Sequence, residues 1–209
     1  MIPKININER YIEESETNRA DEPYQDFYEV LAAVFNMENV NSFMDVGCAD
    51  GNLIKIVHNQ NPDIDVAGIE YFDYHKKYAD LKIVDKMKIL DIRDTLPVDL
   101  LNKKFDIVVC TEIGEHIDPA YTTAFLENIK KLVGKYLIMT WSRHGGEKER
   151  HKDPHHQHLN PLEFDQFLKV MNDHGFLYDQ NLTIASHHFI ESKKSFHFWW
   201  KESFTVWQK

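Results

Sequence analysis

The feature that most constrains this chain is a regular alternation of short apolar runs with longer amphipathic segments. Near-continuous apolar runs occupy residues 42–47, 65–70, 86–92, 105–113 and 136–142. Apolar residues recur at helical spacing between several of these runs, and also before the first one at residues 21–35. Strands that are apolar along their whole length are buried on both faces, which is typical of parallel strands covered by helices. The pattern therefore predicts an α/β fold with a mostly parallel sheet and helices on both faces.

The C-terminal part of the chain departs from this alternation. A helix is expected after residue 160, with Asn160 as its N-cap, Pro161 at its first position and Gly175 at its end. Residues 182–190 and 195–209 have the pattern of two further strands. We expect these two to form an antiparallel hairpin that closes one edge of a seven-stranded sheet.

Length and charge limit the class of protein. The chain has 209 residues, so we expect residues 1–209 to form a single domain with a polar N-terminal segment at 1–20. No apolar run approaches the roughly 18 residues that a membrane span needs. The formal net charge of −10 repels a phosphate backbone, so nucleic acid is not expected as a partner.

The two cysteines, Cys48 and Cys110, both lie in apolar segments. The first residues lack the pattern of a secretory signal, so we expect a cytoplasmic, reducing environment. In that environment the two thiols are expected to be buried and free, without a disulfide.

Acidic side chains follow three successive strands, at the edge where ligands of open α/β sheets bind. Residues 45–52 form a loop in which Gly47 permits a tight turn and Gly51 opens the next helix. Glu70 ends the second strand, where a carboxylate can accept hydrogen bonds from ribose hydroxyls. Asp91 follows the third strand, where an adenine amino group needs an acceptor. Each feature alone has a plain structural interpretation, but their order along the sheet indicates an adenosine-containing cofactor.

These motifs resemble the class I S-adenosylmethionine (SAM) dependent methyltransferase family. The loop DVGCADG is similar to the family motif D/E-x-G-x-G-x-G, with Ala49 in place of the middle glycine, a substitution that is tolerated if φ is negative there. The resemblance implies a Rossmann-like fold and SAM as the cofactor. A nicotinamide enzyme is the rival interpretation, but it normally needs the motif G-x-G-x-x-G.

The same resemblance implies a set of cofactor-binding residues. Asp45 and the loop backbone are expected to hold the methionine part, Glu70 the ribose, and Asp91 with Ile92 the adenine. The full set consists of Asp45, Gly47, Ala49, Asp50, Gly51, Asn52, Glu70, Tyr71, Asp91, Ile92 and Thr111.

A second group of chemically active residues follows the fourth strand. Glu112, Glu115 and His116 are three and four residues apart, so a helical turn would place them on one face. Two carboxylates and an imidazole suit a divalent cation such as Mg²⁺, Mn²⁺ or Fe²⁺. The plainer interpretation is a solvated helix start. Five histidines in the loop at 144–158 follow the fifth strand, and we expect one of them to reach the same edge.

The E-x-x-E-H pattern with a later histidine before a helix resembles two groups of methyltransferases. One group methylates the 2′-oxygen of the 3′-terminal ribose of small RNAs, and its later histidine corresponds to His155 when counted from an N-cap at Asn160. The other group comprises bacterial and viral sugar O-methyltransferases, in which the histidine corresponds to His156. The implied metal ligands are Glu112, Glu115, His116 and either His155 or His156, with His116 and Glu115 as catalytic residues.

We therefore expect a SAM-dependent O-methyltransferase that acts on a sugar or glycan hydroxyl with help from Mg²⁺ or Mn²⁺. A bound cation lowers the pKa of a substrate hydroxyl and orients its oxygen toward the methyl group. Three alternatives stay open, namely an RNA 3′-terminal ribose 2′-O-methyltransferase, a methyltransferase of another small molecule, and a non-catalytic protein that retains the fold. The sequence leaves the particular sugar and the oligomeric state open.

Overall fold

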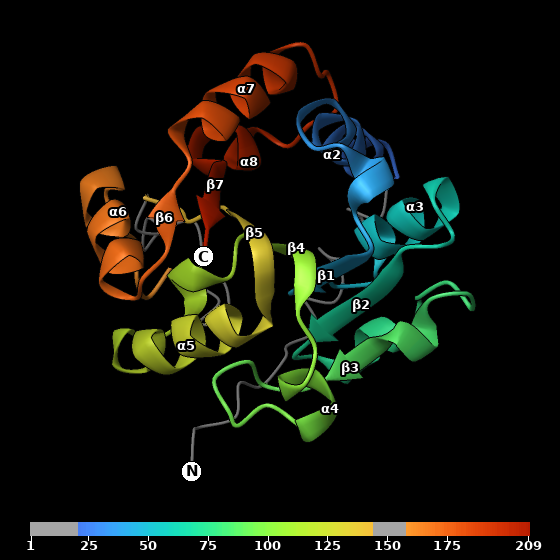
Figure 1. Cartoon of the computed structure of the whole chain (residues 1–209). Helices are drawn as coiled ribbons and strands as arrows, with labels where there is room; N and C mark the ends of the chain where they lie inside the picture. The colour runs from blue at the N-terminus through green and yellow to red at the C-terminus, as the bar shows by residue number, and fades with distance from the viewer. Residues whose placement is uncertain (1–20, 144–157) are drawn as a thin grey trace, which may run out of the picture.

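The computed structural model describes residues 21–143 and 158–209. Its centre is one seven-stranded sheet with the strand order β3-β2-β1-β4-β5-β7-β6 (Figure 1). The strands are β1 (Ser42–Val46), β2 (Asp65–Glu70), β3 (Met87–Ile89), β4 (Phe105–Cys110), β5 (Val133–Met139), β6 (Leu177–Tyr178) and β7 (Thr205–Gln208). The strands β1 to β5 are parallel to one another, whereas β7 is antiparallel to both β5 and β6. The predicted class is therefore confirmed, including the antiparallel strands at one edge.

Helices cover both faces of this sheet. Figure 1 shows α5 and α6 on one side and α2, α3 and α7 on the other. The α-helices are α2 (Glu22–Val34), α3 (Asn52–Gln60), α4 (Val98–Leu101), α5 (Thr122–Leu132), α6 (Phe164–Asp173), α7 (Gln180–Glu191) and α8 (Phe198–Ser203). Short 3-10 helices are η1 (Met37–Asn39), η2 (Asp73–Lys77), η3 (Val84–Lys86), η4 (Gly114–His116) and η5 (Pro119–Tyr121).

The strand β4 shows why the sequence is apolar without alternation. Ile107 and Val109 pack into the core layer beneath α2 and α3. Val108 and Cys110 pack into the opposite layer beneath α5 and α6. All four side chains are fully buried, so each position must be apolar whichever face it points to. The central strand thereby joins two hydrophobic cores into one fold.

The prediction of strands for the last 30 residues was partly wrong. Residues 182–190 belong to α7 and do not form a strand. The buried residues of α7 are Thr183, Ser186 and Ile190, and this spacing of three and four is that of a helix face. Asp179 caps the helix by accepting a hydrogen bond from the Leu182 amide at 2.9 Å. The antiparallel pair β6–β7 is therefore not a hairpin, because α7 and α8 lie between its strands in the chain.

The N-cap of α6 is Glu163, and the prediction of Asn160 was wrong. Glu163 and Gln166 form a reciprocal capping box, which satisfies backbone donors at the start of the helix. Asn160 instead holds the preceding loop in place. Its backbone amide donates to the Glu115 carbonyl at 2.9 Å, and its own carbonyl accepts the Trp141 indole N–H at 2.7 Å.

Two further expectations concern the whole chain. Cys48 and Cys110 are both buried and free, as predicted. In the described residues, no helix has the length and apolar character required to cross a membrane.

Candidate active site

A cavity of about 350 Å³ opens at the carboxyl ends of β1, β2 and β4. Eight of the residues predicted to bind the cofactor line it, namely Asp45, Gly47, Ala49, Glu70, Tyr71, Asp91, Ile92 and Thr111. In the described part of the chain, Asp50, Gly51 and Asn52 do not line the cavity. Gly51 is the N-cap of α3 and Asn52 its first residue, while Asp50 is buried beside His75. The loop therefore contributes its first half to the cavity and its second half to the helix start.

The loop after β1 has a left-handed backbone at three positions. Gly47 has a φ of 81°, and a Cβ there would lie 2.3 Å from the Ile113 side chain, so only glycine fits. Ala49 has a φ of 46°, not the negative φ under which alanine is tolerated there. The reason is a hydrogen bond of 2.9 Å from the Ala49 amide to Oε2 of Glu70, which this strained conformation directs.

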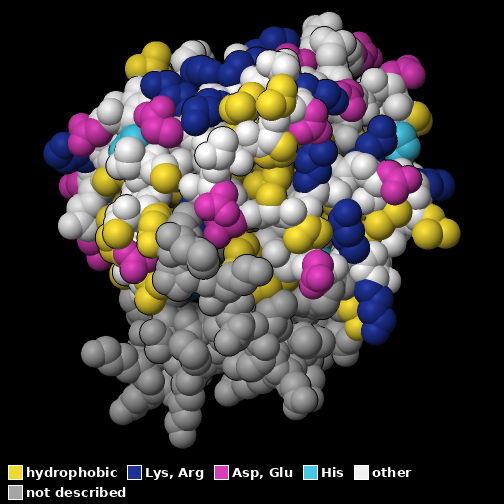
Figure 2. All heavy atoms as spheres, turned by 90° about the horizontal axis from the view of Figure 1, so that it is seen from below, with side chains coloured by type: hydrophobic (Ala, Val, Ile, Leu, Met, Phe, Trp, Pro, Cys, Tyr) yellow, Lys and Arg dark blue, Asp and Glu magenta, His cyan; other side chains and the backbone are white. Residues whose placement is uncertain are grey.

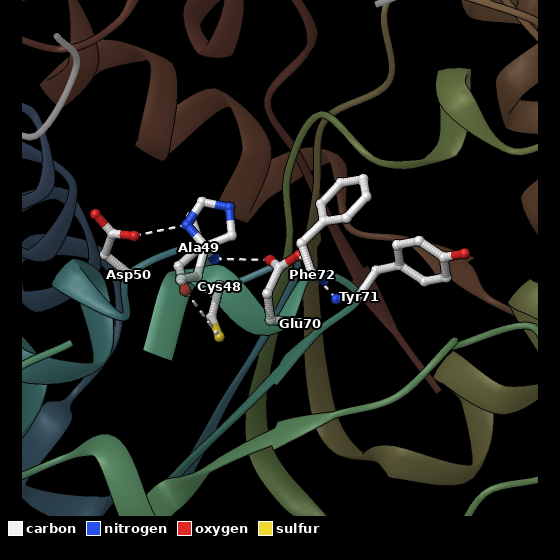
Figure 3. Close-up of polar contacts among 7 residues, drawn as sticks. Cys48, Ala49, Asp50, Glu70, Tyr71 and Phe72 are labelled. Atoms are coloured by element: carbon white, nitrogen blue, oxygen red, sulfur yellow. Dashed lines mark hydrogen bonds and ion pairs between the residues drawn. The ribbon is translucent and has the colours of Figure 1, made fainter. Parts of the chain in front are cut away.

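Glu70 is held between two segments of the chain (Figure 3). Its Oε2 accepts the Ala49 amide, and its Oε1 accepts the amides of Tyr71 and Phe72 at 2.8 and 2.9 Å. A carboxylate has about four acceptor positions, so capacity remains on Oε2. Glu70 is thus fixed at the cavity wall with an acceptor left for a ligand hydroxyl.

Asp45 lies at the end of β1 and is 5% exposed. Burial and the nearby Glu70 carboxylate raise the pKa of Asp45 to about 7. Across the same cavity, burial and the charge of Asp45 raise the pKa of Tyr24, so its hydroxyl stays a hydrogen-bond donor. A cationic group of a ligand would favour the ionised form of Asp45.

Asp91 is already engaged by a residue that the sequence analysis missed. Both oxygens of Asp91 accept hydrogen bonds from the Arg93 guanidinium, the shortest at 2.6 Å, and the Arg93 amide adds another. Arg93 also lies over the Tyr121 ring at 5.4 Å. Asp91 can therefore bind the amino group of adenine only if its oxygens accept hydrogen bonds from Arg93 and from adenine at the same time. A basic residue two positions after the predicted acceptor was the available signal.

Glu112 follows β4 with a φ of 56°, a strained value for a residue other than glycine. The hydroxyl of Thr140, at the end of β5, maintains this conformation. It accepts the Glu112 amide at 2.9 Å and donates to Oε1 of Glu112 at 2.8 Å. Thr140 is fully buried. The sequence analysis did not assign it to the site, because only the pairing of β5 with β4 places it beside Glu112.

Glu115, His116 and His158 come together within the 3-10 turn η4 and the segment before α6. One ligand atom from each lies within 4.8 Å of the others. Glu115 is fully buried, and neither carboxylate oxygen has a hydrogen-bond partner with good distance and angle in the described residues, although the Glu112 carboxyl and the Ser142 amide lie close enough to influence its pKa. Burial, followed by the charge of Glu112, raises the pKa of Glu115 well above its usual range. A positive ion bound by this group would stabilise the ionised form of Glu115 and so lower its pKa.

The structure brings His158 to this group. Its ring lies 5.0 Å from that of His116, at 81° between the planes. The Asn160 contacts described above fix the backbone two residues later, which positions His158 beside η4. His155 and His156, the histidines predicted as ligands, lie outside the described residues.

The opposite wall of the cavity consists of residues that the sequence analysis did not assign to the site. They are Tyr24 and Phe27 from α2, and His197 and Trp200 from the start of α8. The His197 and Trp200 rings lie 4.6 Å apart, and Tyr24 contacts Trp200 at 5.6 Å. Burial lowers the pKa of His197, so its imidazole is neutral at neutral pH. Aromatic residues near both ends of the described chain were the only signal.

Comparison with known proteins agrees with this geometry. A family model described as a methyltransferase domain matches residues 17–181. A SAM-dependent methyltransferase from Archaeoglobus fulgidus is similar in structure, with a TM-score of 0.63 and 13% identity over 97% of this chain and 100% of that chain. Magnesium protoporphyrin IX methyltransferase from Synechocystis PCC 6803, solved with SAH, has a TM-score of 0.59 and 14% identity over 99% of this chain and 89% of that chain. The plantazolicin methyltransferase BpumL in complex with SAH has a TM-score of 0.62 and 15% identity over 95% and 88%. No curated protein matches significantly.

The family match covers most of the chain, and the structural matches share its fold. The chain belongs to the methyltransferase-domain family. The enzyme class predicted from the sequence, a SAM-dependent methyltransferase, is therefore confirmed.

Proposed function

We propose that this methyltransferase transfers the methyl group of SAM to a hydroxyl of a sugar or glycan, with a divalent cation at Glu115, His116 and His158. The observation that supports this most is the buried carboxylate of Glu115, which lies beside two imidazoles and has no hydrogen-bond partner with good distance and angle in the described residues. His116 and Glu112 line the same cavity as the predicted cofactor residues. The cation group and the methyl donor would therefore share one reaction space.

The cavity suits SAM in size and in chemistry. Its volume of about 350 Å³ lies within the range of small-molecule sites. Asp45, once ionised, would attract the positive charge of the methionine part, and the remaining acceptor of Glu70 would bind ribose. When bound, SAM supplies a methyl group on a sulfonium that is already a strong electrophile. The protein is left with two tasks, which are to orient the acceptor oxygen and to remove its proton.

The residues around Glu115 fit a hard or borderline divalent cation. One carboxylate and two imidazoles are present in the described residues, and Glu112 lies next to them. Mg²⁺ and Mn²⁺ both prefer oxygen ligands and retain positions for a substrate, and the two imidazoles favour Mn²⁺, the softer of the two ions. When bound, such an ion lowers the pKa of a hydroxyl and holds two neighbouring oxygens. Glu115 and His116 would then position the acceptor, and a neighbouring imidazole or carboxylate would receive its proton.

The preference for a sugar rests on charge and on the chemistry of a diol. A sugar offers two adjacent hydroxyls that chelate one ion, and it brings no phosphate backbone to a chain with a net charge of −10. His197 and Trp200 line the cavity, and aromatic side chains suit the apolar face of a sugar. Figure 2 shows Lys and Arg side chains mixed with Asp and Glu side chains on the face it presents.

One observation favours a second candidate, the 2′-O-methylation of an RNA 3′-terminal ribose. In the RNA-modifying group that the motif resembles, a histidine stands five residues before the N-cap of the next helix. With the N-cap at Glu163, that position is His158, the residue that joins Glu115 and His116. A terminal ribose also offers a vicinal diol, so the same cation site would serve both substrates.

A turnover screen separates these candidates. SAM consumption would be measured with a panel of mono- and oligosaccharides and with short RNAs, before and after chelation and with added Mg²⁺ or Mn²⁺. We expect cation-dependent methylation of a sugar, with no turnover on RNA. Turnover on RNA with a steep dependence on salt would replace the first candidate by the second. Full turnover in the chelated enzyme would remove the cation from the mechanism.

A further inference from the structure

We propose that Asp50 and His75 are positioning residues, and that the short polar contact between them holds the ribose-binding carboxylate of Glu70 in its working orientation. Neither residue lines the cavity, so both act through the backbone around them. The inference rests on the proposed function in one respect, namely that Glu70 accepts a hydrogen bond from the ribose of SAM.

The pair joins two segments that are 25 residues apart in the chain. Oδ1 of Asp50 lies 2.6 Å from Nδ1 of His75, and the side chains are 8% and 3% exposed. Asp50 directly follows Ala49 in the loop after β1, and His75 lies in η2, the 3-10 helix after β2. Figure 3 shows Asp50 on one side of the Glu70 carboxylate and the Tyr71–Phe72 segment on the other.

The orientation of Glu70 depends on the spacing of these two segments. One of its oxygens accepts the amide of Ala49, and the other accepts the amides of Tyr71 and Phe72. A shift of either segment would therefore rotate the carboxylate or break one of its hydrogen bonds. The Asp50–His75 pair bridges the same two segments at a second point, so it keeps their spacing constant.

The strain at Ala49 makes such a bridge necessary. Its φ of 46° is unfavourable for alanine, so the residue would relax if its neighbours allowed it. The next residue is Asp50, whose side chain is held by His75 in the protein interior. Even a buried ion pair is weak support for stability, because apolar residues of the same volume often replace it without loss. The contribution of the contact here is the fixed geometry of the loop.

The test uses His75→Phe, His75→Asn, Asp50→Asn and the Asp50→Asn/His75→Phe double variant of the full chain. Asparagine places an amide nitrogen near the position of the imidazole Nδ1, so His75→Asn retains the hydrogen bond. The matched control is His174→Phe, which removes a histidine that bonds the Val170 carbonyl at 2.8 Å on α6. Calorimetry would measure the affinity of each protein for SAH and for 2′-deoxy SAH, and thermal unfolding would report whether each variant folds.

We expect His75→Phe to bind SAH about tenfold more weakly, the effect of one charged hydrogen bond. Its preference for SAH over the 2′-deoxy analogue should also shrink toward one, because Glu70 has lost its orientation. His75→Asn should retain most of the affinity for SAH and most of the preference. The double variant should lose no more affinity than the single variant that binds SAH less tightly, because the two residues act through one contact. His174→Phe should match wild type.

A purely structural role would weaken both ligands equally and leave the preference unchanged in His75→Phe. That result would overturn this inference while leaving the Glu70 assignment intact. Equal affinity of the wild-type protein for the two ligands would instead overturn the Glu70 assignment, and this inference with it. If His75→Phe fails to fold, Asp50→Asn, which removes the charge of the acceptor with little change in shape, replaces it, and we expect a loss of affinity and of preference in the same direction; wild-type values in a folded Asp50→Asn would overturn the inference.

Discussion

The two ends of the cavity are built in different ways. At the Asp45–Glu70 end, backbone amides of the chain satisfy the carboxylate of Glu70 from two sides. At the Glu112–Glu115 end, a fully buried carboxylate has no hydrogen-bond partner with good distance and angle in the described residues and has a strongly raised pKa. We call the first the complete end, because the protein's own amides already hold the Glu70 carboxylate. We call the second the incomplete end, because burial and the charge of Glu112 disfavour the ionised form of Glu115 there.

This difference shows how one fold serves many substrates. In the proposed function the complete end would bind the methyl donor, which is the same in every reaction of the class, and its geometry follows from the strands and the loop after β1. The incomplete end would face the acceptor, and its residues come from η4 and the segment before α6. Function is therefore argued best from the residues at the second end.

The largest expected effect is at the incomplete end. Glu115→Gln should reduce turnover at least about a hundredfold, because a direct cation ligand should matter more than the outer partners of such ligands, whose loss costs about ten- to a hundredfold. Its affinity for SAM should stay near that of wild type, because the residue lies outside the lining of the cavity. Steady-state kinetics and calorimetry check the two halves of the prediction. A parallel loss of SAM affinity would show that the two ends are not separable.

Thr140→Val is the next largest change. It keeps the shape of the side chain but removes the hydroxyl that holds Glu112 in its strained conformation. Removing such a support typically costs about ten- to a hundredfold in metal affinity or activity. Thr140→Ser, which retains the hydroxyl, should behave like wild type. Equal Mn²⁺ affinity and turnover in Thr140→Val and wild type would show that the Glu112 conformation does not matter.

At the complete end, SAM affinity should depend on pH through Asp45. Its pKa is about 7 in the free protein, and a cationic ligand needs the ionised carboxylate. Affinity should therefore rise as pH increases, by about tenfold between pH 6 and pH 8, because the proton must leave before the ligand binds. Asp45→Asn should bind weakly at both pH values, with no such rise. A wild-type affinity that is flat across this range would contradict the assignment of Asp45.

The smallest effect is expected at Ala49. Glycine relieves about 1–2 kcal/mol of left-handed strain, but it loses about 0.4–1 kcal/mol through the greater freedom of the unfolded chain. Ala49→Gly should therefore raise the free energy of unfolding by about 0–1.6 kcal/mol and leave SAM affinity unchanged. Chemical denaturation measures this, and a clear destabilisation would show that the Ala49 methyl group has a packing role.

The two ends also differ in how far the sequence predicted them. The strand pattern and the glycine turn predicted the sheet and most of the residues that line the Asp45–Glu70 end of the cavity. Buried strands and tight turns are local properties, so the sequence shows them directly. The segment before α6 was harder to predict, because the N-cap is Glu163 and not Asn160. The histidine that was counted back from the N-cap is therefore His158 and not His155. Thr140 and His75 act through contacts between distant segments, which no local pattern encodes. Arg93 differs from them, because it bonds Asp91 only two residues away and its spacing was the available signal.

The central claim is that the incomplete end binds a divalent cation. Titration of the full chain with Mn²⁺ in the presence of SAH, followed by calorimetry, tests it without knowledge of the acceptor. We predict one site in wild type, loss of that site in Glu115→Gln, and retention in Glu127→Gln, a control at an exposed position of α5. No saturable binding by wild type, or equal binding by wild type and Glu115→Gln, would contradict the account.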